Sequence, residues 1–138
     1  MINAVSIVPR YAETDKMGII HHSVYATWYE LARTEYFNTI GLRYDELEES
    51  DLITPLVELN CKYKKPVYYN REVAVETKLI ELTPAKFVLQ YDIYNKEGDL
   101  INTGTTLLAW ADSKTFKLIN LKKSRPELYA KLEDLVEG

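Results

Sequence analysis

The chain has 138 residues and a mass of 16.0 kDa, which is the size of a single domain. Its formal net charge of −4 leaves no broad basic surface for a phosphate backbone, so nucleic acid is excluded as an expected partner. One cysteine, Cys61, and the adjacent pair His21 and His22 supply neither an internal disulfide nor a ready zinc site. No stretch approaches the ~18 apolar residues of a membrane span, and the N-terminus lacks a signal-peptide pattern, so we expect a cytoplasmic protein.

The first part of the chain predicts one long helix. A strand over about residues 2–8 precedes it, and the helix itself is expected from about His22 to Ile40. Gly41 supplies a C-terminal stop, and a short polar helix is expected over residues 44–49. The long helix is predicted from side chains that recur at helical spacing, namely Tyr25, Trp28, Tyr29, Ala32, Tyr36, Phe37 and Ile40.

The middle of the chain predicts strands. Apolar and polar residues alternate over residues 53–63, 72–79 and 86–93, which is typical of an antiparallel sheet with one covered face. Residues 100–112 alternate less well and are expected to form a central strand, and residues 126–132 have helical spacing. With no repeat or linker, the chain predicts a single α+β domain over residues 1–138, in which a five-stranded antiparallel sheet wraps around the long helix. An open sheet edge favours pairing with a second copy.

The segment from Arg10 to His22, between the first strand and the long helix, carries the candidate chemistry. Asp15 lies in a turn-forming context, and Gly18 permits backbone conformations that other residues resist. A carboxylate therefore precedes a helix N-terminus, where free N–H groups attract developing negative charge. This arrangement suits acyl transfer, in which the amides polarise a carbonyl and the carboxylate attacks it or activates water. Asp15 has the alternative of acting only as a turn former or helix cap.

The same segment resembles a known enzyme family. The pattern Tyr11-x-x-Thr14-Asp15-x-x-Gly18-x-x-x-His22-x-x-Tyr25-x-x-Trp28-x-Glu30-x-x-Arg33-x-Glu35 is similar to the 4-hydroxybenzoyl-CoA thioesterase family, in particular its bacterial acyl-CoA thioesterase branch. Residues 63–70 and the stretch from Gly104 to Asp112 also resemble the family, so the likeness covers most of residues 3–125.

The resemblance implies a hotdog fold, hydrolysis of an acyl-CoA thioester, and active sites at the interface of a homodimer or homotetramer. It implies that Asp15 is the catalytic carboxylate and that the backbone N–H of His22 polarises the thioester oxygen. The His22 imidazole and the Tyr11 phenol are implied to assist catalysis. Coenzyme A belongs to the substrate, and no metal or redox cofactor is implied.

Further residues are assigned to substrate binding, each with a structural alternative. They are Gly18 in the loop, Tyr25 and Trp28, which line an acyl pocket or simply pack in the core, and Lys64 and Lys65. Together with Lys62, these two lysines form a basic cluster that either contacts the phosphates of coenzyme A or is a solvated turn.

Three residues with reactive side chains are expected to be structural. Glu30 competes with Asp15 for the catalytic role, but we favour an ion pair of Glu30 with Arg33 or Arg10. Cys61 is expected to be a small buried hydrophobic residue, and His21 is given no chemical role.

The sequence therefore predicts an acyl-CoA thioesterase. An acyl carrier protein in place of coenzyme A, and a non-catalytic hotdog module that binds acyl chains or dimerises, are the alternatives. The preferred acyl chain is left open, because pocket depth depends on packing.

Overall fold

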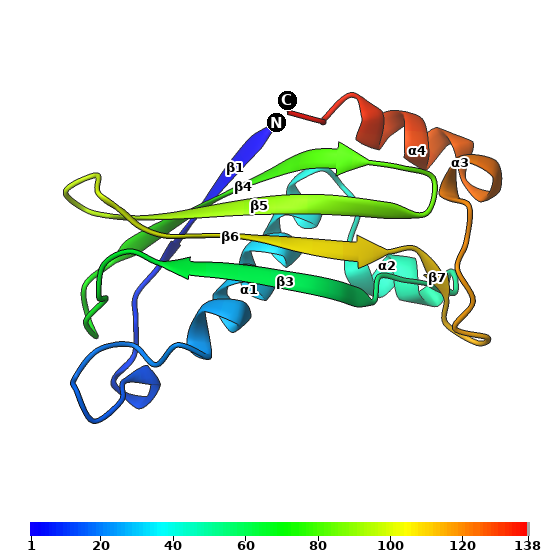
Figure 1. The fold of residues 1–138 in the computed structure, drawn as a ribbon. Helices are drawn as coiled ribbons and strands as arrows, with labels where there is room; N and C mark the ends of the chain where they lie inside the picture. Colours follow the sequence, from blue (N-terminus) through cyan, green and yellow to red (C-terminus); the bar gives the residue numbers. More distant parts are fainter. Residues whose placement is uncertain (138) are drawn as a thin grey trace.

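The computed structural model describes residues 1–137 and confirms the predicted α+β architecture (Figure 1). The main sheet has five strands in the order β1-β4-β5-β6-β3, and every neighbouring pair is antiparallel. Figure 1 shows the sheet lying across α1, with the N- and C-termini close together. The elements are β1 (Ile2–Ile7), the 3-10 helix η1 (Tyr11–Glu13), α1 (Val24–Thr39), α2 (Tyr44–Glu49), β2 (Leu52–Ile53), β3 (Leu56–Tyr63), β4 (Val73–Leu82), β5 (Lys86–Asn95), β6 (Leu100–Ala109), β7 (Ala111–Asp112), α3 (Leu121–Ser124) and α4 (Pro126–Glu133).

The long helix begins later than its sequence pattern suggests. The helix α1 starts at Val24 rather than His22, and it ends at Thr39 before Gly41, whose φ is +79°. The start is shifted because residues 21–23 form a turn in which the amide of Val24 donates to the carbonyl of His21 (3.0 Å). His22 therefore lies just before the helix rather than in it.

One predicted strand is two strands. Residues 52–53 pair with β7 in a small separate sheet, whereas residues 56–63 form the edge strand β3 next to β6. Pro55 lies between the two and has no N–H for a ladder hydrogen bond, although its carbonyl accepts from the amide of Ala109 (3.0 Å). The expectation that residues 100–112 form a central strand is confirmed for residues 100–109, because β6 lies between β5 and β3, whereas residues 111–112 form β7 in the small separate sheet.

The core lies between α1 and the concave face of the sheet. The Tyr29 ring is fully buried and stacks on Tyr91, with ring centroids 4.4 Å apart. Gly104 of β6 leaves the room that Tyr29 occupies, because a Cβ at this position would collide with the Tyr29 phenol and with the carbonyl of Asn60. The Tyr29 hydroxyl donates to the side chain of Asn102, so this buried phenol is paired.

The edge strand β3 is exposed on both faces. The side chains of Leu56, Val57 and Tyr63 are each about half exposed. An unpaired edge with apolar side chains is a surface that soluble proteins usually cover. In the part of the chain that the structure describes, no helix is long and apolar enough to cross a membrane.

Candidate active site

The loop between β1 and α1 is fixed by one buried carboxylate. Glu13 accepts hydrogen bonds from the backbone amide of Arg10 (2.7 Å) and from the indole of Trp28 (3.1 Å). The Arg10 guanidinium lies 3.5 Å from the same carboxylate, and the carbonyl of Glu13 accepts from the amide of His21 (2.8 Å). These contacts of Glu13 form a brace that ties the loop to α1. Sequence reasoning missed this residue, because spacing does not distinguish a buried Glu from a solvated one.

Asp15 lies in a tight turn supported by this brace. Its Oδ1 accepts from the amide of Met17 (2.8 Å), and its carbonyl accepts from the amide of Gly18 (3.1 Å). Gly18 has φ +80°, which is the left-handed region that favours glycine. Oδ1 takes part in the turn, whereas Oδ2 has no hydrogen-bond partner within residues 1–137. Asp15 is therefore a turn former that still offers one carboxylate oxygen.

The turn before α1 leaves one amide unused. The imidazole Nδ1 of His21 accepts from the amide of Ser23 (3.2 Å) and lies 2.8 Å from its hydroxyl, so His21 caps the start of the helix. The amide of His22 donates to no acceptor among the described residues. The exposed His22 ring packs on His21, with ring centroids 4.1 Å apart. An unused N–H thus lies at the end of the helix that favours negative charge.

A cavity of about 460 Å³ joins Asp15 and His22. Its walls come from the loop, the first turn of α1 and the end of the edge strand β3. The lining residues are Asp15, Met17, Ile19, Ile20, His22, Tyr25, Tyr63, Lys64, Lys65 and Pro66. In residues 1–137 no group of three or more His, Cys, Asp or Glu side chains is placed to hold a metal ion.

Two tyrosines give the cavity neutral phenols. Tyr25 is 3% exposed, and burial raises its pKa to about 12. Tyr63 packs edge-on against Tyr25 and donates to the carbonyl of His22 (3.1 Å), and its pKa is also raised to about 12, mainly by desolvation. Neither phenol ionises near neutral pH, so both act as hydrogen-bond donors rather than as bases.

The structure brings together five of the eight residues assigned from the sequence. Asp15, His22, Tyr25, Lys64 and Lys65 line the cavity. The other three lie elsewhere: Tyr11 is 75% exposed and packs edge-on against Tyr69, Trp28 is buried on Glu13, and Gly18 borders a second, larger hollow. Of the two roles left open for Trp28, the structure shows the packed one, in which its indole also anchors the loop through Glu13.

The expected ion pair of Glu30 is wrong. Arg10 pairs with Glu13, and the Arg33 guanidinium donates to the Tyr91 hydroxyl (3.1 Å). Glu30 is exposed and forms no ion pair with any residue from 1 to 137. Both cations are held by other partners, so the expected pair does not form.

Cys61 is half-buried and in polar surroundings rather than fully buried in an apolar core. Its Sγ accepts from the amide nitrogen of Asn102 and lies near the Tyr29 hydroxyl, each at 3.4 Å. The polar partners come from α1 and β6, which a strand pattern in the sequence does not reveal.

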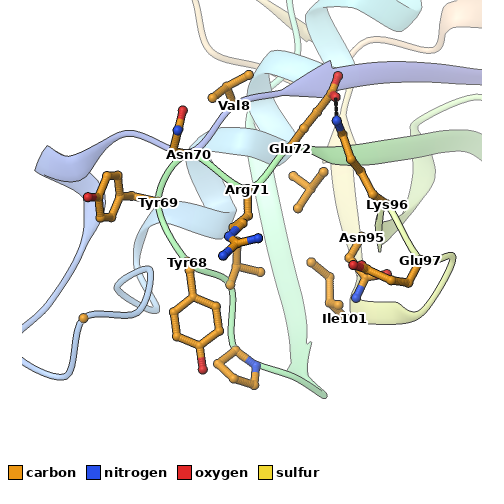
Figure 2. Close-up of a pocket in the computed structure, with 14 residues that line it drawn as sticks. Val8, Tyr68, Tyr69, Asn70, Arg71, Glu72, Asn95, Lys96, Glu97 and Ile101 are labelled. Carbon is orange, nitrogen blue, oxygen red and sulfur yellow. Dashed lines mark ion pairs between the residues drawn. The ribbon is translucent and has the colours of Figure 1, made fainter.

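The second hollow lies beside the same loop. It has a volume of about 1070 Å³ and is drawn in Figure 2. Pro66 lines both hollows, so the two are adjacent. Residues from three regions of the chain, 8–18, 66–73 and 95–101, form the second hollow, which is why no local motif indicated it.

Comparisons with known proteins show what the chain is similar to. A family described as the thioesterase-like superfamily matches residues 9–132. The Bacillus subtilis protein named "Putative acyl-CoA thioesterase YneP" is 34% identical over 132 residues, covering 96% of each chain. The Escherichia coli acyl-CoA thioester hydrolase YbgC is 26% identical over 119 residues, covering 83% of this chain and 85% of that protein.

Solved structures show the same similarity. A DHNA-CoA thioesterase from Staphylococcus aureus is 38% identical with a TM-score of 0.92, covering 96% of this chain and 89% of that one. A protein of Thermus thermophilus is 32% identical with a TM-score of 0.89, covering 100% of both chains.

Proposed function

The chain belongs to the thioesterase-like superfamily, and from this premise we propose that it hydrolyses acyl-coenzyme A to the free acid and coenzyme A. The observation that supports the proposal is that Asp15 and His22 line one cavity and that the His22 amide has no acceptor among the described residues. This pair has the two functions that thioester hydrolysis needs, a carboxylate and an oxyanion donor.

The reaction uses the two groups in sequence. The amide of His22 donates to the thioester oxygen and stabilises the negative charge that develops on it. The free oxygen of Asp15 either attacks the carbonyl carbon or takes a proton from an attacking water. In the first route the C–S bond breaks as an anhydride forms between the acyl group and Asp15, and water then hydrolyses this anhydride to the free acid and the Asp15 carboxylate. In the second route the water adds to the carbonyl carbon and the C–S bond then breaks. Coenzyme A leaves as the thiolate in both routes.

Neighbouring side chains orient the substrate. We assign the His22 imidazole to the cavity rim and the Tyr25 phenol to the interior, where it donates a hydrogen bond. Tyr11 lies outside the lining, so we assign it a contact with the part of the substrate that leaves the cavity. Lys64 and Lys65 are exposed on the cavity wall and attract an anionic substrate.

We propose that a second copy of the chain completes the site. One wall of the cavity comes from Tyr63, Lys64 and Lys65, at the end of the exposed edge strand β3. Pairing of β3 with the same strand of a second copy would cover Leu56 and Val57 and close this side. A homodimer is therefore the smallest active unit of the proposal.

The test is thiol release from a panel of acyl-CoA substrates. The panel begins with aromatic acyl groups, because the similar protein of Staphylococcus aureus is described as a DHNA-CoA thioesterase, and continues through short and long aliphatic chains. Asp15→Asn should reduce turnover by about a thousandfold and leave the melting temperature nearly unchanged. Asp45→Asn is the matched control, since Asp45 is an exposed aspartate on α2 that pairs with Arg43.

Each outcome separates the alternatives. Wild-type turnover by Asp15→Asn would contradict the assignment of Asp15. Binding of acyl-CoA by the wild-type protein with no thiol produced would instead indicate a non-catalytic module. Faster turnover with acyl carrier protein than with coenzyme A would change the carrier and keep the chemistry.

A further inference from the structure

Among the residues from 1 to 137 that line the larger hollow, one cation, Arg71, forms no ion pair. Figure 2 shows Arg71 directed into the hollow between Tyr68 and Ile101. Arg71 is exposed and forms no ion pair with any carboxylate of residues 1–137. The two other charged groups that face each other here, Lys96 and Glu72, pair at 3.2 Å, and Glu97 lies on the wall beside them. The guanidinium N–H groups of Arg71 are therefore available to hydrogen-bond a ligand.

Two aromatic side chains lie on one side of the same hollow. Tyr68 and Tyr69 line it, and each is 51% exposed. Tyr11 packs edge-on against Tyr69 from the neighbouring loop, with ring centroids 5.5 Å apart. Exposed phenol rings offer faces on which a base can stack, and a free guanidinium offers a forked donor for phosphate. This combination suits a nucleoside phosphate.

The hollow lies within reach of the proposed catalytic groups. The amide of Asp15 donates to the carbonyl of Ile19, and Ile19 forms a β-bridge with Tyr68. Two such steps of about 4.8 Å limit the separation between the backbones of Tyr68 and Asp15 to at most about 10 Å. Gly18 borders the hollow, and a Cβ there would meet no atom within 4 Å, so the surface of the loop is open at Gly18.

We propose that this hollow binds the nucleotide end of coenzyme A, with Arg71 on a phosphate and Tyr68 or Tyr69 against the adenine. The proposal rests on the proposed acyl-CoA hydrolysis. The pantetheine arm would run from the cavity of Asp15 over Pro66 and Gly18 into the hollow. Of the two lysines first considered for the phosphates, Lys65 already pairs with Asp99 at 3.3 Å, which leaves Lys64 as a further cation at the cavity wall.

The test compares one acyl group on two thiols, coenzyme A and pantetheine, which lacks the nucleotide. Arg71→Gln should raise KM for acyl-CoA about tenfold with kcat unchanged, because it removes a charge-assisted hydrogen bond to phosphate. The same variant should hydrolyse acyl-pantetheine like the wild-type protein. Arg43→Gln is the matched control and should change neither substrate, because Arg43 lies at the start of α2 and pairs with Asp45.

A binding measurement keeps the inference separate from the proposed function. Adenosine bisphosphate, the nucleotide part of coenzyme A, should bind the wild-type protein and bind Arg71→Gln about tenfold more weakly. If the wild-type protein hydrolyses neither thioester, the proposed function fails, and this binding result still decides whether the hollow takes a nucleotide.

Three outcomes would overturn the inference. The first is an unchanged KM and unchanged nucleotide binding in Arg71→Gln. The second is an equal loss on acyl-CoA and acyl-pantetheine, which would indicate a structural effect. The third is a change in elution volume on gel filtration without a change in nucleotide binding, which would indicate that a second copy of the chain occupies the hollow.

Discussion

The two ends of α1 are completed in different ways. At the C-terminal end, the amide of Gly41 donates to Asn38 (3.0 Å) and the amide of Leu42 donates to Phe37 (2.8 Å), which are the paired bonds of a Schellman motif. At the N-terminal end, the Ser23 side chain makes no cap hydrogen bond and the first turn contains no acidic residue. The amide of His22 is left without an acceptor in the described chain.

This difference separates stability from function along a single helix. A saturated helix end, in which the backbone groups have hydrogen-bond partners, contributes to folding but has no free group that could bind a ligand. An unsaturated end costs stability and keeps an N–H free for a ligand. Substitutions at the C-terminal end should therefore change stability alone, and substitutions at the N-terminal end should change stability and turnover together.

The largest effect on stability is expected at Gly104 of β6, which faces Tyr29 between the two ends of α1. Gly104→Ala should lower the free energy of unfolding by about 3 kcal/mol, because its methyl group would collide with Tyr29 and the backbone of Asn60. Urea unfolding measures the loss. The neighbouring Thr105→Ala is the control, and an equally small effect in both variants would contradict the close packing of Tyr29 on β6.

A smaller effect is expected at alkaline pH, from Tyr25 in the first turn of α1. The pKa of this phenol is raised from 10.0 to about 12 by burial, so the unfolded chain releases the proton first. The folded state then binds more protons than the unfolded state, and stability falls as the pH rises from about 10 to about 12.

The size of this loss follows from the shift, at roughly 1.4 kcal/mol for each pKa unit. Urea unfolding at a series of pH values should show a shallower decline for Tyr25→Phe than for the wild-type protein. Identical slopes would mean that the Tyr25 phenol is as well solvated in the folded protein as in the unfolded chain.

Gly41→Ala tests the saturated end. Its φ of +79° costs an alanine about 1 to 2 kcal/mol, so the melting temperature should fall. Turnover per folded molecule should match the wild-type protein. A lower turnover at a temperature where the variant is fully folded would contradict the division between the two ends.

His21→Ala tests the unsaturated end, with the smallest expected effect on stability. Loss of the Nδ1 acceptor for the Ser23 amide should cost about 1 kcal/mol, the usual value of a cap. Turnover should fall as well, because the freed Ser23 amide and the altered turn change the setting of the His22 N–H. A thermal melt and the thiol-release assay on the same sample measure both effects.

Much of the fold could be predicted because periodicity is local. The spacing of Tyr25, Trp28, Tyr29 and Ala32 indicated α1, and alternation indicated the strands. The start of α1 was placed two residues early, because a histidine that caps through its imidazole has no ordinary sequence signal. The break at Pro55 was missed because apolar alternation continues across it.

The candidate site was only partly predictable, since it depends on contacts between distant segments. Asp15 and His22 lie on one contiguous loop, so a resemblance over that loop was enough to indicate them. Glu13 lies in the same loop and gave no signal, because its role depends on its burial. Arg71 lies in the segment between β3 and β4 and gave no signal, because its role depends on the absence of an ion-pair partner within residues 1–137. The pairing expected for Glu30 failed for the same reason, as spacing alone does not orient a side chain.

The brace formed by Glu13 has a consequence for engineering. Residues 10–28 hold their own geometry, since Glu13 binds the Arg10 amide, the Trp28 indole and, through its carbonyl, the His21 amide. Outside this segment, the carbonyl of Val67 supplies an anchor for the amide of Ile20 (2.8 Å). The stretch is therefore a candidate segment for transplantation onto another helix-and-sheet scaffold. The transplanted segment must include Trp28, and the scaffold must supply an acceptor in place of the Val67 carbonyl.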